Sequence, residues 1–156
     1  MRSSPTSSHP AKPVSSPEEK AFLDLLRTCD LLSRGAAHVL KAQDLSPTQY
    51  NVLRILRGEP KGLPCGEIGC RMITRDPDIT RLLDRLEKRG LVSRVRDTED
   101  RRVVLTRISS EGLKVLSRLD VPVQDAHRKQ LGHLGQERLR QLANLLEVAR
   151  GQVRTS

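Results

Sequence analysis

The chain has 156 residues, a length that fits one domain of ordinary size and leaves no room for a two-domain enzyme. Lysine and arginine total 28 against 19 aspartate and glutamate residues, and the net charge of +9 favours a polyanionic partner, nucleic acid first. The only aromatic residues are Phe22 and Tyr50, too few for a platform that stacks single-stranded bases. No run of apolar residues exceeds three, so we expect neither a membrane span nor a signal peptide.

Cysteine usage and the missing catalytic motifs predict a non-enzymatic protein of the cytoplasm. Cys29, Cys65 and Cys70 are sparse and odd in number, which suits a reducing compartment rather than a disulfide scaffold. The sequence holds no CxxC, no HExxH, no glycine-rich phosphate loop and no legible Ser/His/Asp arrangement. We therefore expect no catalytic residue, no metal site and no cofactor.

The first predicted elements are a tail and a long helix. Residues 1–16 hold six serines and three prolines and almost nothing apolar, so burial cannot offset their ordering entropy and we predict a disordered tail. Ser16, Pro17 and Glu19 form a helix start, and apolar residues then recur at helical spacing to about residue 43. Cys29 lies on this apolar stripe and is predicted to be a buried filler.

Two shorter helices follow. Residues 46–49 (SPTQ) repeat the start signal, and the helix they open ends at Gly58, with a buried face of Val52, Leu53 and Leu56. After a loop rich in glycine and proline, a short helix over 66–72 is predicted to bury Ile68.

The next helix has two contrasting faces. It is predicted to begin at Asp76-Pro77 and to run to about Arg89, with Gly90 as its stop. At about 100° per residue, the apolar residues fall on one face: Ile79, Leu82, Leu83 and Leu86. The opposite face is polar and mainly basic, and it collects Pro77, Thr80, Arg81, Asp84, Arg85 and Lys88.

Beyond Gly90 the pattern changes to alternating β-branched residues. Residues 91–96 and 103–108 flank the polar turn 97–102, which predicts a β-hairpin. A long helix begins at residues 109–112, and Pro122 is expected to kink it or to end its first half. A last helix is predicted over 136–153.

This order predicts a mainly α fold with a small β-hairpin wing, a winged helix-turn-helix over about residues 45–109. In such a fold one helix enters the major groove of DNA, and the hairpin reaches the neighbouring backbone or minor groove. A basic helix face alone is equally typical of a solvated surface, because Asp84 and Lys88 stand at ion-pair spacing. The hairpin that follows it favours DNA.

Four segments of the sequence resemble the MarR family of bacterial transcription regulators. They are LSPTQYNVL (45–53), DITRLLDRLEKRGLV (78–92), DTEDRRVVL (97–105) and ISSEG (108–112), within a resemblance over roughly residues 20–150. The resemblance implies a homodimer, joined through flanking helices at about 17–43 and 110–153, that binds a pseudo-palindromic operator. It also implies a repressor whose DNA affinity is lowered by a small ligand, often phenolic, or in some members by thiol oxidation.

The resemblance also implies roles for single residues. Asp100 and Arg102 match the family's D-x-R wing motif, so Arg102 is expected in the minor groove, where the negative potential attracts a guanidinium. Asp100 is expected to orient an arginine and to shape the turn. The planar donors of arginine suit guanine or a phosphate. The other predicted DNA contacts are Arg75, Asp78, Thr80, Arg81, Arg85 and Arg101.

Alternatives stay open at three points. Where many family members carry small hydroxyl residues, this chain has Asp76-Pro77-Asp78, and Asp78 suits either a helix cap or an acceptor for cytosine N4. A metal- or thiol-responsive regulator requires cysteines or histidines that converge, although Cys65 and Cys70 point about 140° apart on one helix. A protein-interaction module without DNA binding would use the same basic face for an acidic protein.

Overall fold

The computed structural model describes residues 16–153, which form a mainly α fold with a small antiparallel sheet. In chain order the elements are α1 (Pro17–Leu40), η1 (Lys41–Gln43), α2 (Pro47–Arg57), β1 (Leu63–Pro64), α3 (Cys65–Arg71), α4 (Ile79–Lys88), β2 (Val92–Arg96), β3 (Val104–Ile108), α5 (Ser110–Leu131), η2 (Gly132–Leu134) and α6 (Gly135–Val153). The predicted tail lies outside the described residues except for Ser16. The Ser16 hydroxyl caps α1 by accepting a hydrogen bond from the Glu19 amide (3.1 Å).

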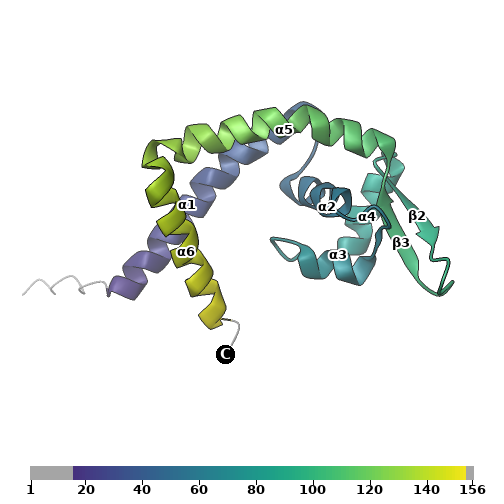
Figure 1. Ribbon diagram of the computed structural model, residues 1–156, viewed down its shortest axis with the longest axis horizontal. Coiled ribbons are helices and arrows are strands. Elements are labelled where there is room, and N and C mark those ends of the chain that lie inside the picture. Colours follow the sequence, from purple (N-terminus) through teal and green to yellow (C-terminus); the bar gives the residue numbers. More distant parts are fainter. Residues whose placement is uncertain (1–15, 154–156) are drawn as a thin grey trace, which may run out of the picture.

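The helices form a long arm and a compact lobe (Figure 1). The arm consists of α1, α5 and α6; the lobe consists of α2, α3, α4 and the sheet. Within the arm α1 packs against α5, and the Gln130 amide donates to the Leu32 carbonyl (3.1 Å). Gly35 makes room for this contact, because a Cβ there would lie 2.1 Å from Gln130 Nε2.

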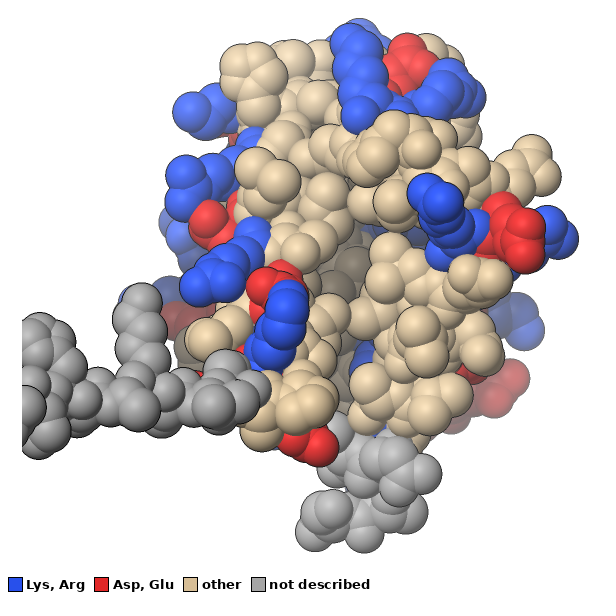
Figure 2. Space-filling view, turned by 90° about the vertical axis from the view of Figure 1, so that its left-hand side faces the viewer, with Lys and Arg blue, Asp and Glu red and all other residues tan. Residues whose placement is uncertain are grey.

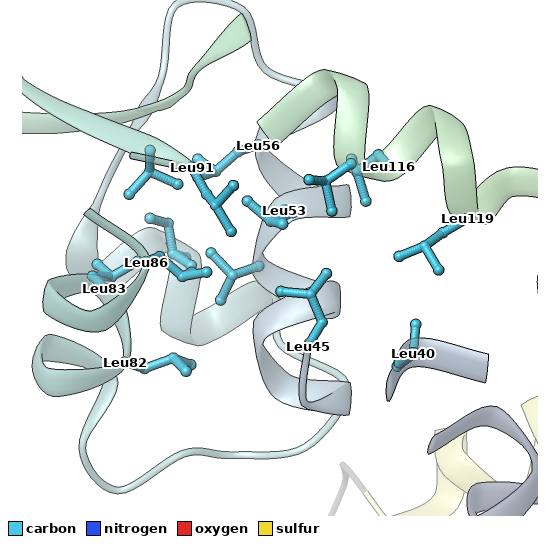
Figure 3. Packing of buried hydrophobic residues seen from close by; sticks show 14 of the residues in the cluster. Leu40, Leu45, Leu53, Leu56, Leu82, Leu83, Leu86, Leu91, Leu116 and Leu119 are labelled. Atoms are coloured by element: carbon cyan, nitrogen blue, oxygen red, sulfur yellow. The ribbon is translucent and has the colours of Figure 1, made fainter. Parts of the chain in front are cut away.

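A leucine-rich core holds the lobe together (Figure 3). The helix faces predicted from periodicity are confirmed, since the fully or almost fully buried residues are Val52, Leu53 and Leu56 of α2, Ile68 of α3, and Leu82, Leu83 and Leu86 of α4. The first half of α5 adds Leu116 and Leu119 to the same core, so α5 belongs to both arm and lobe. Burial of one face of α4 leaves its basic face turned outward.

The predicted hairpin is present, and a third strand joins it. β2 and β3 are antiparallel, with Val92 opposite Ile108 and Arg96 opposite Val104. The short strand β1 was not predicted; it pairs with the other edge of β3 and gives the order β1-β3-β2. Gly62 permits the approach, because its φ is 86° and a Cβ there would lie 2.8 Å from the Thr106 carbonyl oxygen.

The start of α4 differs from the prediction, since the helix begins at Ile79 and not at Asp76. The Asp76 carboxylate accepts a hydrogen bond from the Asp78 amide (2.9 Å) and so closes a turn across Pro77. Asp78 then caps the helix with its own carboxylate. Both aspartates are good caps, and the second of them starts the helix.

Of the two outcomes predicted for Pro122, a kink or an end to the first half of the helix, the second does not occur, because α5 continues from Ser110 to Leu131. Pro122 itself is exposed, whereas Leu119 and Val123 on either side of it are buried against the lobe. Proline costs one backbone hydrogen bond in a helix, and the burial of its apolar neighbours offsets that loss.

The prediction of a buried Cys29 is also wrong: Cys29 is exposed. It shares a stripe of α1 with Phe22 and Leu26, which are 60% and 53% exposed, and Leu145 of α6 is 66% exposed. Figure 2 shows this end of the arm as largely uncharged surface on both sides of a hollow, with many of the charged side chains toward the edges. Periodicity located the stripe correctly, but no other part of residues 16–153 covers it.

Candidate nucleic-acid interface

The outward face of α4 presents three of the seven side chains predicted to contact DNA, those of Thr80, Arg81 and Arg85. Thr80, Arg81, Arg85 and Lys88 are all exposed, and the Arg81 side chain keeps 80% of its accessible surface. Arg75 is exposed in the loop that precedes the helix. These groups are therefore available to a large partner that lies along α4.

Asp78 lies at the start of the same face, but its carboxylate is engaged within the protein. One oxygen accepts from the Arg81 amide (3.2 Å), and the other lies 3.2 Å from Arg81 Nε. Of the two roles that the sequence left open for Asp78, this geometry favours the helix cap over the cytosine acceptor.

Hydrogen bonds fix the turn of the wing, residues 97–103. The Asp97 amide donates to the Val103 carbonyl, and the Val103 amide donates to the Asp100 carbonyl, both at 2.9 Å. The Asp100 carboxylate accepts from the Arg102 amide (2.9 Å). Asp100 thus shapes the turn through the backbone of Arg102 and leaves the guanidinium free. Arg101 and Arg102 are both exposed at this turn.

Arg94 links the wing to α4 through ion pairs, and this role was not predicted from the sequence. From β2 its guanidinium reaches Asp84 (2.6 Å) and Glu87 (3.1 Å), and its amide donates to Glu87 (3.2 Å). Asp84 is thus paired with Arg94 and not, as the spacing suggested, with Lys88. The available signal was a pair of acidic residues on α4 followed by an arginine in the middle of the first hairpin strand.

The pattern of ion pairs separates structural cations from free ones. On the arm, Lys20, Arg34 and Arg128 pair with acidic residues on their own helix. At the candidate interface, five cations have no acidic partner within residues 16–153: Arg75, Arg85, Lys88, Arg101 and Arg102. Uncompensated positive charge attracts a polyanion and releases the counterions of a phosphate backbone.

The structure gives no support to a metal- or thiol-responsive site. Cys65 and Cys70 lie on α3 as free thiols, and Cys65 Sγ is 3.9 Å from Thr80 Oγ1. Across the described part of the chain, no three His, Cys, Asp or Glu side chains are placed to hold a metal ion. In the same range, none of the helices combines the length and the apolar character needed to cross a membrane.

Known proteins share this arrangement. The sequence profile of the MarR family matches residues 45–104. A MarR transcription factor from Planctomyces limnophilus, known from its crystal structure, is 42% identical over 86% of this chain and 98% of that one, with a TM-score of 0.66. The homoprotocatechuate degradative operon repressor of Escherichia coli is 28% identical over 109 residues, 70% of this chain and 73% of the repressor.

The fold is also that of a mutant MarR from Escherichia coli crystallised with operator DNA, with a TM-score of 0.76 at 23% identity over 83% of this chain and 93% of that one. The family profile covers the lobe, and the 42% identity extends across almost the whole of a MarR transcription factor. This chain therefore belongs to the MarR family.

Proposed function

We propose that this protein is a sequence-specific, double-stranded DNA-binding repressor that acts as a homodimer and responds to a small-molecule effector. The observation that carries the proposal is the free basic face of α4 beside a fixed wing with two exposed arginines. Membership of a family of transcription regulators, and not of enzymes, supports it. We place the protein in the cytoplasm, where its operator would be.

The proposed DNA contacts follow from the geometry of the lobe. With α4 in the major groove, Arg81 and Arg85 reach base edges or phosphates with planar, bidentate donors, and Thr80 offers a hydroxyl. The wing then carries Arg102 toward the adjacent minor groove. In this arrangement residues 45–109 form the reading domain, and the helices at 17–43 and 110–153 hold the two copies together.

The repressor mechanism depends on the spacing of two lobes. Two copies of α4 must stand about 34 Å apart to occupy successive major grooves of one operator. An effector lowers DNA affinity only to the extent that it binds a differently spaced dimer more tightly. Because Phe22 and Tyr50 are the only aromatic residues, we expect aliphatic walls and few stacking contacts around the effector.

Selection of bound duplexes from a random pool tests the proposal. We expect a pseudo-palindromic sequence, with log K falling against log salt by about 0.9 for each phosphate contacted. A pool that yields no enriched sequence, together with no measurable duplex affinity at low salt, would contradict the proposal. That result would favour a protein-interaction module that uses the same basic face.

A further inference from the structure

An open pocket of about 520 Å³ lies where the segment that follows the C-terminal end of α1 meets the end of α4. One wall comes from the junction between α1 and α2, and the other from the last turns of α4. The lining residues are Lys41, Asp44, Leu45, Ser46, Gln49, Arg85, Lys88 and Arg89. None of the DNA contacts predicted from the sequence lies on the junction wall.

The charge of the pocket is strongly unbalanced. Four cations line it against one carboxylate, that of Asp44. None of the four, Lys41, Arg85, Lys88 and Arg89, forms an ion pair with another residue of the described range. The ammonium groups of Lys41 and Lys88 are exposed, and a bound anion would be attracted by both.

The neutral polar groups of the pocket do not compensate this charge. Ser46 and Gln49 satisfy each other in the capping box of α2, through bonds of 3.0 and 3.2 Å. Arg89 donates to the carbonyls of Asp44 (2.5 Å) and Gln43 (3.1 Å), which fixes the position of its guanidinium without neutralising it. Arg85 Nε likewise donates to the Arg81 carbonyl (3.3 Å). The pocket therefore presents two hydrogen-bonded guanidinium groups and two exposed ammonium groups to an incoming anion.

The position of the pocket identifies the anion. Arg85 and Lys88 line the pocket and also belong to the outward face of α4. A duplex that lies along α4 therefore brings one strand of its backbone across the pocket opening. We infer that the pocket binds a backbone phosphate of the operator, so that the DNA contact extends from α4 to Lys41 at the end of the arm; this inference rests on the proposed function.

Such a contact would couple DNA binding to the shape of the protein. Lys41 stands on the arm side of the pocket and Lys88 on the lobe side. A phosphate held between them joins arm and lobe at one angle, in the place where the Arg89 bonds already hold the junction to α4. Operator binding then selects that angle in both copies of the dimer.

The test is the salt dependence of binding for Lys41→Ala and Lys88→Ala, singly and together. Lys129→Ala is the matched control, because it removes the same charge from an exposed position on α5. Binding to the selected duplex and to a scrambled duplex is measured by fluorescence anisotropy between low and physiological salt. Thermal melting checks that each variant is folded, as expected for exposed lysines without hydrogen bonds.

If the two lysines share one phosphate in each half-site, the double variant lowers the log–log salt slope of the dimer by about 1.8, twice the 0.9 of one contact, and each single variant lowers it by less. Both duplexes should lose affinity by the same factor, because a phosphate contact carries no sequence information. Lys129→Ala should keep the wild-type slope. Neutral methylphosphonate linkages at the contacted phosphates should weaken the wild type more than the Lys41→Ala/Lys88→Ala double variant, which keeps only Arg85 and Arg89 in the pocket.

Three results would overturn the inference. The first is a salt slope of Lys41→Ala and Lys88→Ala that equals the slope of Lys129→Ala, while the duplex affinity of the wild type falls steeply with salt. This result would refute phosphate binding in the pocket and would leave the proposed function standing. Inorganic phosphate that stabilises the free wild type but not the double variant, with unchanged duplex slopes, would assign the pocket to a small free anion. A wild type without any duplex affinity would refute both.

Discussion

Arg102 allows one proposed DNA contact to be tested by itself. Its guanidinium is exposed and forms no ion pair with any acidic side chain of residues 16–153, while its backbone amide donates to Asp100. Replacement by alanine removes the charge and keeps the hydrogen bond that shapes the turn. We expect Arg102→Ala to weaken operator binding by about 1–3 kcal/mol and to leave the melting temperature unchanged.

Titration of a labelled duplex measures the affinity, and a thermal scan measures the stability. Arg118→Ala is the control, because it removes the same charge from an exposed position on α5 and should bind like the wild type. If both variants bind equally well, Arg102 does not contact the operator.

Single residues differ in how far the sequence alone predicts their environment. The burial of Leu83 and the exposure of Arg85 follow from helical periodicity, because both depend only on the local winding of one helix. The partners of Arg94 depend on how β2 docks against α4, which no local pattern contains. The exposure of Cys29 likewise reflects what lies opposite α1 in space.

Replacing either of two glycines by alanine tests how the elements pack, and we expect the two changes in the free energy of unfolding to have opposite signs. Gly112 lies in the first turn of α5, where a Cβ would stand 2.3 Å from the Leu91 carbonyl oxygen and 2.8 Å from Ile108 Cγ1. Gly69 lies in α3, where a Cβ would meet nothing within 4 Å. We expect Gly112→Ala to lower the free energy of unfolding by about 1–3 kcal/mol through overpacking against backbone.

For Gly69→Ala we expect a gain of about 0.5–1 kcal/mol, because alanine restricts the unfolded chain and favours the helix. Chemical denaturation of both variants measures the two values. An unchanged stability of Gly112→Ala would show that α5 does not approach the hairpin as closely as the structure has it.

The ion pairs of Arg94 are expected to set the angle between wing and α4. Arg94→Met keeps much of the side-chain volume and leaves Asp84 and Glu87 without their partner. We expect a loss of about 1 kcal/mol in stability, and weaker operator binding although Arg94 is not on the proposed contact face. Lys114→Met, which breaks an exposed ion pair on α5, should change neither quantity.

Denaturation and duplex titration are measured on both variants. If the Arg94→Met variant is measurably less stable but binds the operator with wild-type affinity, the wing keeps its position without these ion pairs.

Element boundaries were predictable where a local signal decides them. The capping box at Ser46 and Gln49 is formed as the sequence indicates. The start of α4 was not, because Asp76 and Asp78 are equally good caps and the turn across Pro77 selects between them. β1 is a short strand without alternation, and it exists only because β3 offers an edge.

For the whole molecule, the exposed apolar stripe of α1 and α6 predicts how two copies associate. Leu26 is 53% exposed on that stripe. A glutamate there would place a charge in the apolar contact between protomers, so we expect Leu26→Glu to sediment with the mass of one chain. Operator affinity should fall by about 100-fold or more, because the two half-sites are no longer bound together.

Leu113→Glu provides the control, since Leu113 is a comparably exposed leucine (41%) on the lobe end of α5. It should sediment as a dimer. A Leu26→Glu variant that also remains dimeric would place the contact between protomers elsewhere on the arm.

The fold of the lobe and the exposure of its basic face were predictable from periodicity together with the family motifs. The relation of arm to lobe was not, because it is set by side-chain bonds between distant segments, such as those from Arg89 to residues 43 and 44. The unbroken course of α5 through Pro122 is of the same kind, as it depends on packing against α1 and α2.

Because α5 is unbroken, a tilt of the helix displaces its two ends relative to each other. Its 22 residues form a rod of about 33 Å that is anchored in the lobe at Gly112 and reaches the far end of the arm. A tilt of about 5° displaces one end of such a rod by about 3 Å relative to the other. In the proposed two-fold dimer this displacement is doubled, so such a tilt changes the distance between the paired α4 helices by up to about 6 Å.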